Sequence, residues 1–140
     1  MNGLFINKKK EEEVAQKYVD ALATKTPGVD QLVVNLSGGN QQKVVIAKWL
    51  TRDCDILIFD EPTRGIDVGA KNEIYKLMNE LAEAGHSIIM VSSDMPELLG
   101  MSDRIVVIYE GRKTGEVSKD EFDPNYILDL ASGGEENGKN

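Results

Sequence analysis

The 140-residue sequence contains only one cysteine, Cys54, and one histidine, His86. A single cysteine excludes a disulfide within the chain and a multi-cysteine zinc site, and a single histidine excludes a histidine-rich metal site. Basic residues are outnumbered, with 16 Lys and Arg against 24 Asp and Glu and a net charge of −8. This balance argues against broad nucleic-acid binding, which needs a basic face. It leaves open a local anion site, because backbone amides at a helix N-terminus bind phosphate.

Long apolar runs are also missing, since the longest has about five residues and a bilayer span needs roughly 20. The opening MNGLFINKKKEEE has no apolar stretch of the kind found in signal peptides. We therefore expect a soluble, cytoplasmic chain. The remaining composition, 41% apolar and 29% charged, is that of an ordinary globular domain.

Periodicity and turn residues predict alternating helices and strands. Two unbroken apolar runs are expected to be strands buried on both faces of a parallel sheet. This order indicates an α/β fold. After an irregular lead over residues 1–10, the expected elements are helices at 11–23, 40–51, 70–84, 96–100 and 123–130, strands at 56–59 and 87–91, and a hairpin of 105–109 with 114–117, followed by a disordered tail at 132–140.

Chemistry is expected first at Leu36-Ser37-Gly38-Gly39-Asn40-Gln41, directly before a helix. The two glycines allow close approach to the backbone. Free amides, the helix dipole and the Ser37 hydroxyl together suit a phosphate. The alternative is a plain glycine-rich turn in which Ser37 caps the helix.

The second site follows the strand 56–59, where Asp60 and Glu61 would lie at the carboxyl end of a parallel strand. Ligands of open α/β sheets bind at this edge. Adjacent strand residues face opposite ways, so the two acids can take different roles. Asp60 would support Mg²⁺ through water, and Glu61 would act as general base on an attacking water. The alternative is an acidic loop after a core strand.

Both segments together, LSGGNQQKVVIAKWL followed by ILIFDEPTRGIDVGAKNEIY, resemble the nucleotide-binding domain of ATP-binding cassette (ABC) transporters. The resemblance covers about residues 10–131. It implies a phosphate-loop NTPase-like fold, in which Glu61 ends the Walker B motif and Asp67 belongs to the D-loop. It also implies that the switch loop is Ser92–Asp94. The residues that match the ATP-contacting signature motif are Leu36, Ser37, Gly38, Gly39, Asn40 and Gln41.

Two segments indicate a subfamily, and they are TRGIDVGAK and SSDMPELLGMSDRI. Both look like the second cassette of duplicated monosaccharide importers of the ribose, galactose and xylose type. Ser93 stands where the family has a switch histidine. A serine hydroxyl can hydrogen-bond a phosphate but cannot carry positive charge. In such importers the second cassette often has an impaired site, while its signature loop completes the site of the first.

No G-x-x-x-x-G-K-[ST] phosphate loop occurs in the sequence. We expect that loop to precede residue 1, so that residues 1–131 form the C-terminal half of a cassette, with the signature helix in 11–51 and the Walker B part in 52–131. Either a truncated gene product or a cloned fragment would account for this. The phosphate-loop strand would lie between 88–91 and 105–109, so a regular continuous sheet is not expected.

The resemblance implies an ATPase of sugar import that uses ATP and Mg²⁺, although the 140-residue chain alone is expected to be inactive. Its partners would be an opposite cassette, transmembrane permease subunits and, indirectly, a sugar-binding protein. The complete transporter would hold it on the inner face of the cell membrane. The alternative function is a non-catalytic interaction or dimerisation module derived from a cassette.

Overall fold

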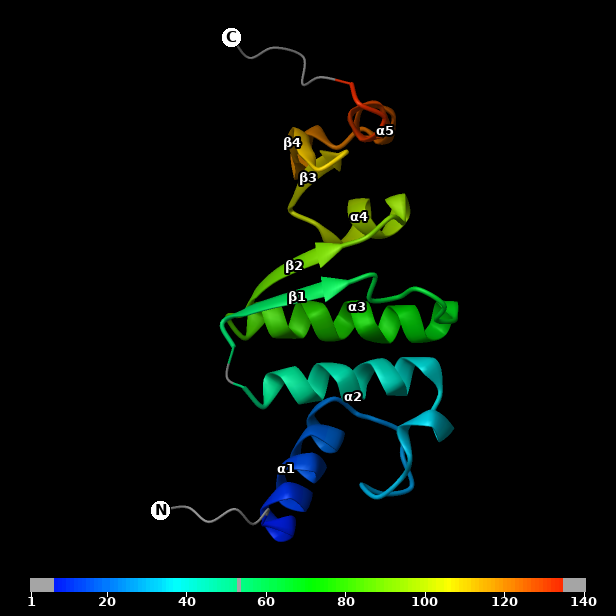
Figure 1. The fold of residues 1–140 in the computed structure, drawn as a ribbon, viewed down its shortest axis with the longest axis vertical. Coiled ribbons are helices and arrows are strands. Elements are labelled where there is room, and N and C mark those ends of the chain that lie inside the picture. Colours follow the sequence, from blue (N-terminus) through cyan, green and yellow to red (C-terminus); the bar gives the residue numbers. More distant parts are fainter. Residues whose placement is uncertain (1–6, 53, 135–140) are drawn as a thin grey trace. The chain divides into compact units, whose positions relative to one another are not determined.

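The computed structural model describes residues 7–52 and 54–134. The chain divides into two compact units, residues 1–89 and 90–140, and the boundary falls within a strand. The first unit contains the helices α1 (Lys8–Ala21), α2 (Gly38–Leu50) and α3 (Val68–Glu83), the short 3-10 helix η1 (Val33–Asn35) and the strand β1 (Ile56–Asp60) (Figure 1). Strand β2 (Ser87–Val91) crosses the boundary, and its last two residues belong to the second unit. The second unit continues with α4 (Met95–Met101), β3 (Arg104–Tyr109), β4 (Arg112–Ser118), η2 (Lys119–Glu121) and α5 (Pro124–Ala131).

Helix α1 begins earlier than the sequence pattern predicted. Asn7 is its N-cap, and the side-chain oxygen of Asn7 accepts a hydrogen bond of 3.2 Å from the backbone N–H of Lys10. An N-cap of this kind satisfies one of the unpaired amides of the first turn. The expectation that residues 8–10 are irregular is therefore wrong.

Strands β1 and β2 pair with each other, and Figure 1 shows α3 running alongside them. Leu57 and Phe59 are buried, whereas Ile56 and Ile58 are 59% and 69% exposed. The prediction that these strands are buried on both faces is wrong for the described residues. Alternate side chains of a strand point to opposite faces. Four apolar side chains of α3 are buried: Ile74, Leu77, Met78 and Leu81.

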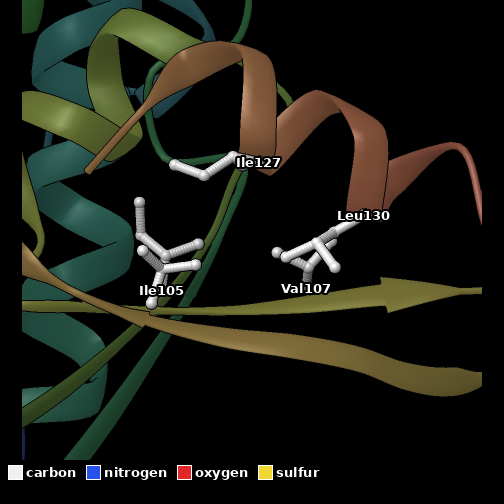
Figure 2. Close-up of a cluster of buried hydrophobic side chains, with 5 residues drawn as sticks. Ile105, Val107, Ile127 and Leu130 are labelled. Atoms are coloured by element: carbon white, nitrogen blue, oxygen red, sulfur yellow. The ribbon is translucent and has the colours of Figure 1, made fainter. Parts of the chain in front are cut away.

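In the second unit, β3 and β4 form the expected hairpin, and α5 packs on it. Figure 2 shows Ile105 and Val107 of β3 facing Ile127 and Leu130 of α5 (Figure 2). Leu130 is fully buried, and an added carbon at Gly115 of β4 would lie 2.5 Å from its Cδ1 atom. A glycine at this point lets the leucine rest directly on the strand backbone.

The described residues form two separate two-stranded sheets, β1–β2 and β3–β4. The expected gap between 88–91 and 105–109 stays a prediction. The fold is an α/β arrangement with a C-terminal hairpin and helix, as predicted. Most of the predicted disordered tail, residues 135–140, lies outside the described residues.

Candidate functional site

The glycine-rich segment forms the start of α2, with Ser37 in the N-cap position. Among the described atoms, the Ser37 side chain accepts no hydrogen bond from a backbone amide of the helix. Its Oγ atom instead accepts a bond of 2.7 Å from the Asn40 side-chain amide. Ser37 therefore occupies the cap position without acting as a side-chain cap.

Two other residues of the segment hold the loop together. The Gln41 side-chain amide donates to the backbone carbonyl of Leu36 over 2.8 Å. The Asn40 side-chain oxygen accepts from the backbone N–H of Lys25, also over 2.8 Å. Asn40 is only 8% exposed. Both side chains thus brace the loop, and a direct role for them toward ATP stays a prediction.

The first turn of α2 is suited to an anion. An α-helix leaves the first N–H groups without acceptors inside the helix, here those of Gly38, Gly39 and Asn40. Ser37 and Gly38 are exposed, so a ligand can reach the loop from solvent. The backbone amides and the helix dipole both favour negative charge at this position.

The same turn lies against the segment that follows β1. A carbon added at Gly38 would lie 4.0 Å from Ile66 Cγ1, and one added at Gly39 would lie 2.7 Å from Ala70 Cβ. Asp67, between these two contacts, is the N-cap of α3 and accepts a hydrogen bond of 3.0 Å from the Ala70 N–H. The structure therefore brings the predicted signature and D-loop segments together.

Asp60 is the last residue of β1 and is exposed, while the neighbouring Glu61 is half-buried. Glu61 has φ 46°, in the left-handed region that residues other than glycine rarely adopt. Strained backbone of this kind is concentrated at functional sites. The two carboxylates lie where the sequence predicted, at the carboxyl end of the strand.

The carboxylates at the end of β1 could hold a magnesium ion only together with waters and substrate phosphates. The described residues contain no group of three or more Asp, Glu, His or Cys side chains that could hold a metal. Mg²⁺ is commonly held by one or two carboxylates together with waters and substrate phosphates. Asp60, as a single exposed carboxylate at a strand end, is suited to that arrangement.

Ser93 belongs to the second unit, in the loop between β2 and α4. Glu97, in the first turn of α4, is only 3% exposed and accepts a short hydrogen bond from the Ser92 hydroxyl. The Asp94 side chain caps the helix by accepting from the Glu97 N–H over 3.3 Å. Sequence reasoning missed Glu97, although Asp94 and Glu97 have the spacing of a capping box.

Lys43 was also missed. It lies in α2, is 5% exposed, and donates from Nζ to Glu73 of α3 over 2.9 Å. The Lys43 ammonium lowers the pKa of Glu73 below its ordinary value, first through this hydrogen bond and then through its charge, and Lys25 acts in the same direction. No pattern in the sequence around Lys43 marks it as buried, because both of its partners are distant in sequence.

Known proteins with similar sequences match nearly the whole chain. The ABC transporter family model matches residues 2–64. The ribose import ATP-binding protein of Clostridium perfringens is 55% identical over 91% of this chain, and the xylose import ATP-binding protein of Thermoanaerobacter pseudethanolicus is 58% identical over 93%. The chain is similar to these two ATP-binding proteins over nearly all of its own length. It spans 26% of the length of each of these two relatives.

Solved structures show that the fold is that of an ABC cassette. A crystal structure of an ATP-binding cassette of an ABC transporter superposes with a TM-score of 0.74 at 22% identity, over 94% of this chain and 50% of the other. A dimeric cassette in a post-hydrolysis state, bound to ADP and phosphate, gives 0.69 at 24% identity over 87% of this chain and 52% of the other. Among the described residues, no helix has the length and apolar character needed to cross a membrane.

Proposed function

We propose that this chain is the signature-bearing part of a cassette ATPase that powers sugar import. The observation that carries the proposal is the packing of the Gly38–Gly39 turn against Ile66 and Ala70, on either side of Asp67. This packing joins an anion-binding helix start to the segment that follows two carboxylates at a strand end. The sugar-import names of the relatives support the choice of substrate class.

In the proposed mechanism, ATP lies between this turn and the phosphate loop of an opposite cassette. Ser37 and the amides of Gly38 and Gly39 hydrogen-bond the γ-phosphate and stabilise the negative charge that develops on it. These donors are fixed before ATP arrives, because Asn40 and Gln41 brace the loop. The preorganised geometry lowers the barrier without further rearrangement.

The carboxylates act on this cassette's own nucleotide. Asp60 would hold Mg²⁺ through water, and the bound ion would supply positive charge to the phosphates. Glu61 orients a water and accepts its proton as the water attacks. With Ser93 in the switch position this second site hydrolyses ATP slowly, and Asp67 links the two sites across the cassette interface. Without a phosphate loop, the 140-residue chain by itself is inactive.

In the assembled importer the partners are an opposite cassette and transmembrane permease subunits, with a sugar-binding protein acting through them. The cassette then lies at the inner face of the cell membrane. The dimeric state of a structurally similar cassette bound to ADP and phosphate supports pairing with a second cassette.

The test is a chimeric protein. The 128-residue matching segment of the Clostridium perfringens ribose import protein is replaced by the corresponding residues of this chain. We expect the chimera to support ribose uptake in cells that lack their own copy, and to hydrolyse ATP when purified with its partners. A matched chimera carrying Ser37→Ala should fold and lose most of the uptake.

A folded chimera that neither hydrolyses ATP nor supports uptake would contradict the proposal. If such a chimera still pairs with a complete cassette, an interaction module becomes the better description of the chain.

A further inference from the structure

Lys43 is a cation with almost no contact with solvent. It is 5% exposed, and its Nζ donates to the backbone carbonyl of Ala23 over 3.2 Å and to Glu73 over 2.9 Å. A buried ammonium group is costly unless it is paired and hydrogen-bonded. These two bonds supply that pairing, and they join α2 to two other segments.

One of these segments is the connection between α1 and α2. Ala23 has φ 47°, a conformation that is unfavourable for alanine, and its carbonyl accepts from Lys43. Two residues further on, the Lys25 N–H donates to Asn40. Asn40 and Lys43 are three residues apart on α2, so they lie on one face of the helix. This face of α2 therefore forms two hydrogen bonds with the backbone of the connection.

The other segment is α3. Glu73 lies one helical turn after Ala70, which touches Gly39. The Lys43–Glu73 pair is thus a further contact between the same two helices, one turn away from the glycine contact. Because an ion pair requires a defined geometry, it restrains the rotation of α2 relative to α3.

We propose that Lys43 is a positioning residue that sets the orientation of the Ser37–Gly39 turn relative to the start of α3. This inference rests on the proposed function, because the turn is taken to bind the γ-phosphate. Lys43 acts through the Ala23 carbonyl and Glu73 and touches no reacting atom. Without Lys43, the turn still binds an anion, but its backbone amides are less well aligned with the γ-phosphate.

The partners of Lys43 explain why a lysine serves here. Its long stem crosses the space between α2 and α3 while the ammonium group donates to two acceptors on different segments. The carboxylate of Glu73 is shared with Lys25, whose Nζ lies 3.5 Å away. An uncharged side chain of similar length fills the space but leaves both acceptors without this donor.

The first test measures ATP hydrolysis by the chimera described above. For Lys43→Met we expect kcat to fall by between about tenfold and 10²-fold, because misplacement of binding groups by about an ångström has effects of this size. We expect KM for ATP to change by less than about twofold, since ground-state binding is retained. Lys43→Arg should recover most of kcat, because the guanidinium group reaches the same acceptors.

The matched control is Lys76→Met. Lys76 lies in α3, is 80% exposed at its side chain and pairs with Glu80 over 3.7 Å. This variant should leave kcat and KM unchanged. Glu73→Gln removes the carboxylate charge but keeps an oxygen that can accept a hydrogen bond from Lys43, and it should lower kcat in the same direction as Lys43→Met but less. An equal effect of Lys43→Met and Lys76→Met, or a rise in KM alone, would overturn the inference.

The second test needs no catalysis, so it separates this inference from the proposed function. Amide hydrogen exchange of the 140-residue chain is compared between wild type and Lys43→Met. We expect faster exchange at residues 23–25 and 38–41, and unchanged exchange in β3 and β4. If exchange rises uniformly or stays the same, Lys43 does not position the turn, whether or not the chimera is active.

Discussion

A carbon added at the Cβ position of Gly39 would lie 2.7 Å from the Cβ atom of Ala70, closer than such atoms approach in real proteins. The sequence alone predicts that this glycine allows the close approach of a phosphate. The structure gives it another task, which is to let the first turns of α2 and α3 meet. Both tasks favour glycine, so mutational effects at this position need a control that separates them.

Gly39→Ala should destabilise the first unit by about 1–3 kcal/mol, the usual cost of overpacking. Ala70→Gly removes the opposing methyl group at a cost of about 1 kcal/mol in helix propensity. In the Ala70→Gly background, the additional effect of Gly39→Ala should shrink to below about 0.5 kcal/mol, as expected for residues in contact. Urea unfolding of the four proteins measures these differences.

Gly28→Ala provides the matched control, because an added carbon at Gly28 meets nothing within 4 Å. It should change the free energy of unfolding by less than about 0.5 kcal/mol. If Gly39→Ala is as harmless as Gly28→Ala, the close contact with Ala70 does not constrain the fold.

Leu130→Ala should cost the second unit about 2–5 kcal/mol, since Leu130 is completely buried between α5 and the hairpin. Leu128→Ala on the same helix is the control, because Leu128 is 59% exposed. Amide exchange in β3 and β4 measures the local free energy of opening. Similar losses in both variants would contradict the placement of α5.

Stability of the second unit should depend on pH through Glu116. Hydrogen bonds from Lys113 and Arg104 lower the pKa of Glu116 from 4.5 to about 2. A lowered folded-state pKa means that the carboxylate stabilises the fold above pH 4.5, and that this contribution disappears as the pH falls toward 2. Glu116→Gln should therefore lower Tm at pH 7 and have little effect near pH 2.

Thermal unfolding of both proteins across this pH range measures the effect. The exposed Glu121 of the same unit, changed to Gln, provides the comparison at each pH. A Tm difference for Glu116→Gln that is the same at every pH would show that its ion pairs do not set the acid sensitivity.

Much of this architecture follows from local patterns in the sequence. The i, i+3, i+4, i+7 spacing of apolar residues predicted α3, and Gly85, with φ 100°, ends it as expected for a left-handed residue. The Asp60–Glu61 pair could be placed at a strand end because an apolar run precedes it. These features depend on residues close in sequence, which single-sequence reasoning treats best.

The misses concern contacts between distant segments. Burial of Lys43 depends on Glu73 and on the Ala23 carbonyl, and nothing in the residues near Lys43 encodes either partner. The sequence also did not predict the exposure of Ile56 and Ile58. Their run is apolar enough for burial on both faces, but helical cover lies on one face among the described residues. Hydrophobicity alone does not show which face of a strand a helix will cover.

The two proposed roles of this cassette predict unequal effects of two substitutions in the chimera. Ser37→Ala removes a donor to the γ-phosphate at the working site of the opposite cassette, so kcat should fall by about 10²–10³-fold, as for other donors that stabilise developing charge. Glu61→Gln affects the site of this cassette, where Ser93 replaces the switch histidine. Its effect should stay below about tenfold, whereas a general base at a fully working site contributes about 10²–10⁴-fold.

Adding Ser93→His should make Glu61→Gln more costly, because an imidazole can carry the positive charge that serine lacks. ATP hydrolysis rates of the single and double variants measure this, and equal losses for Ser37→Ala and Glu61→Gln would show that this cassette's own site is fully active.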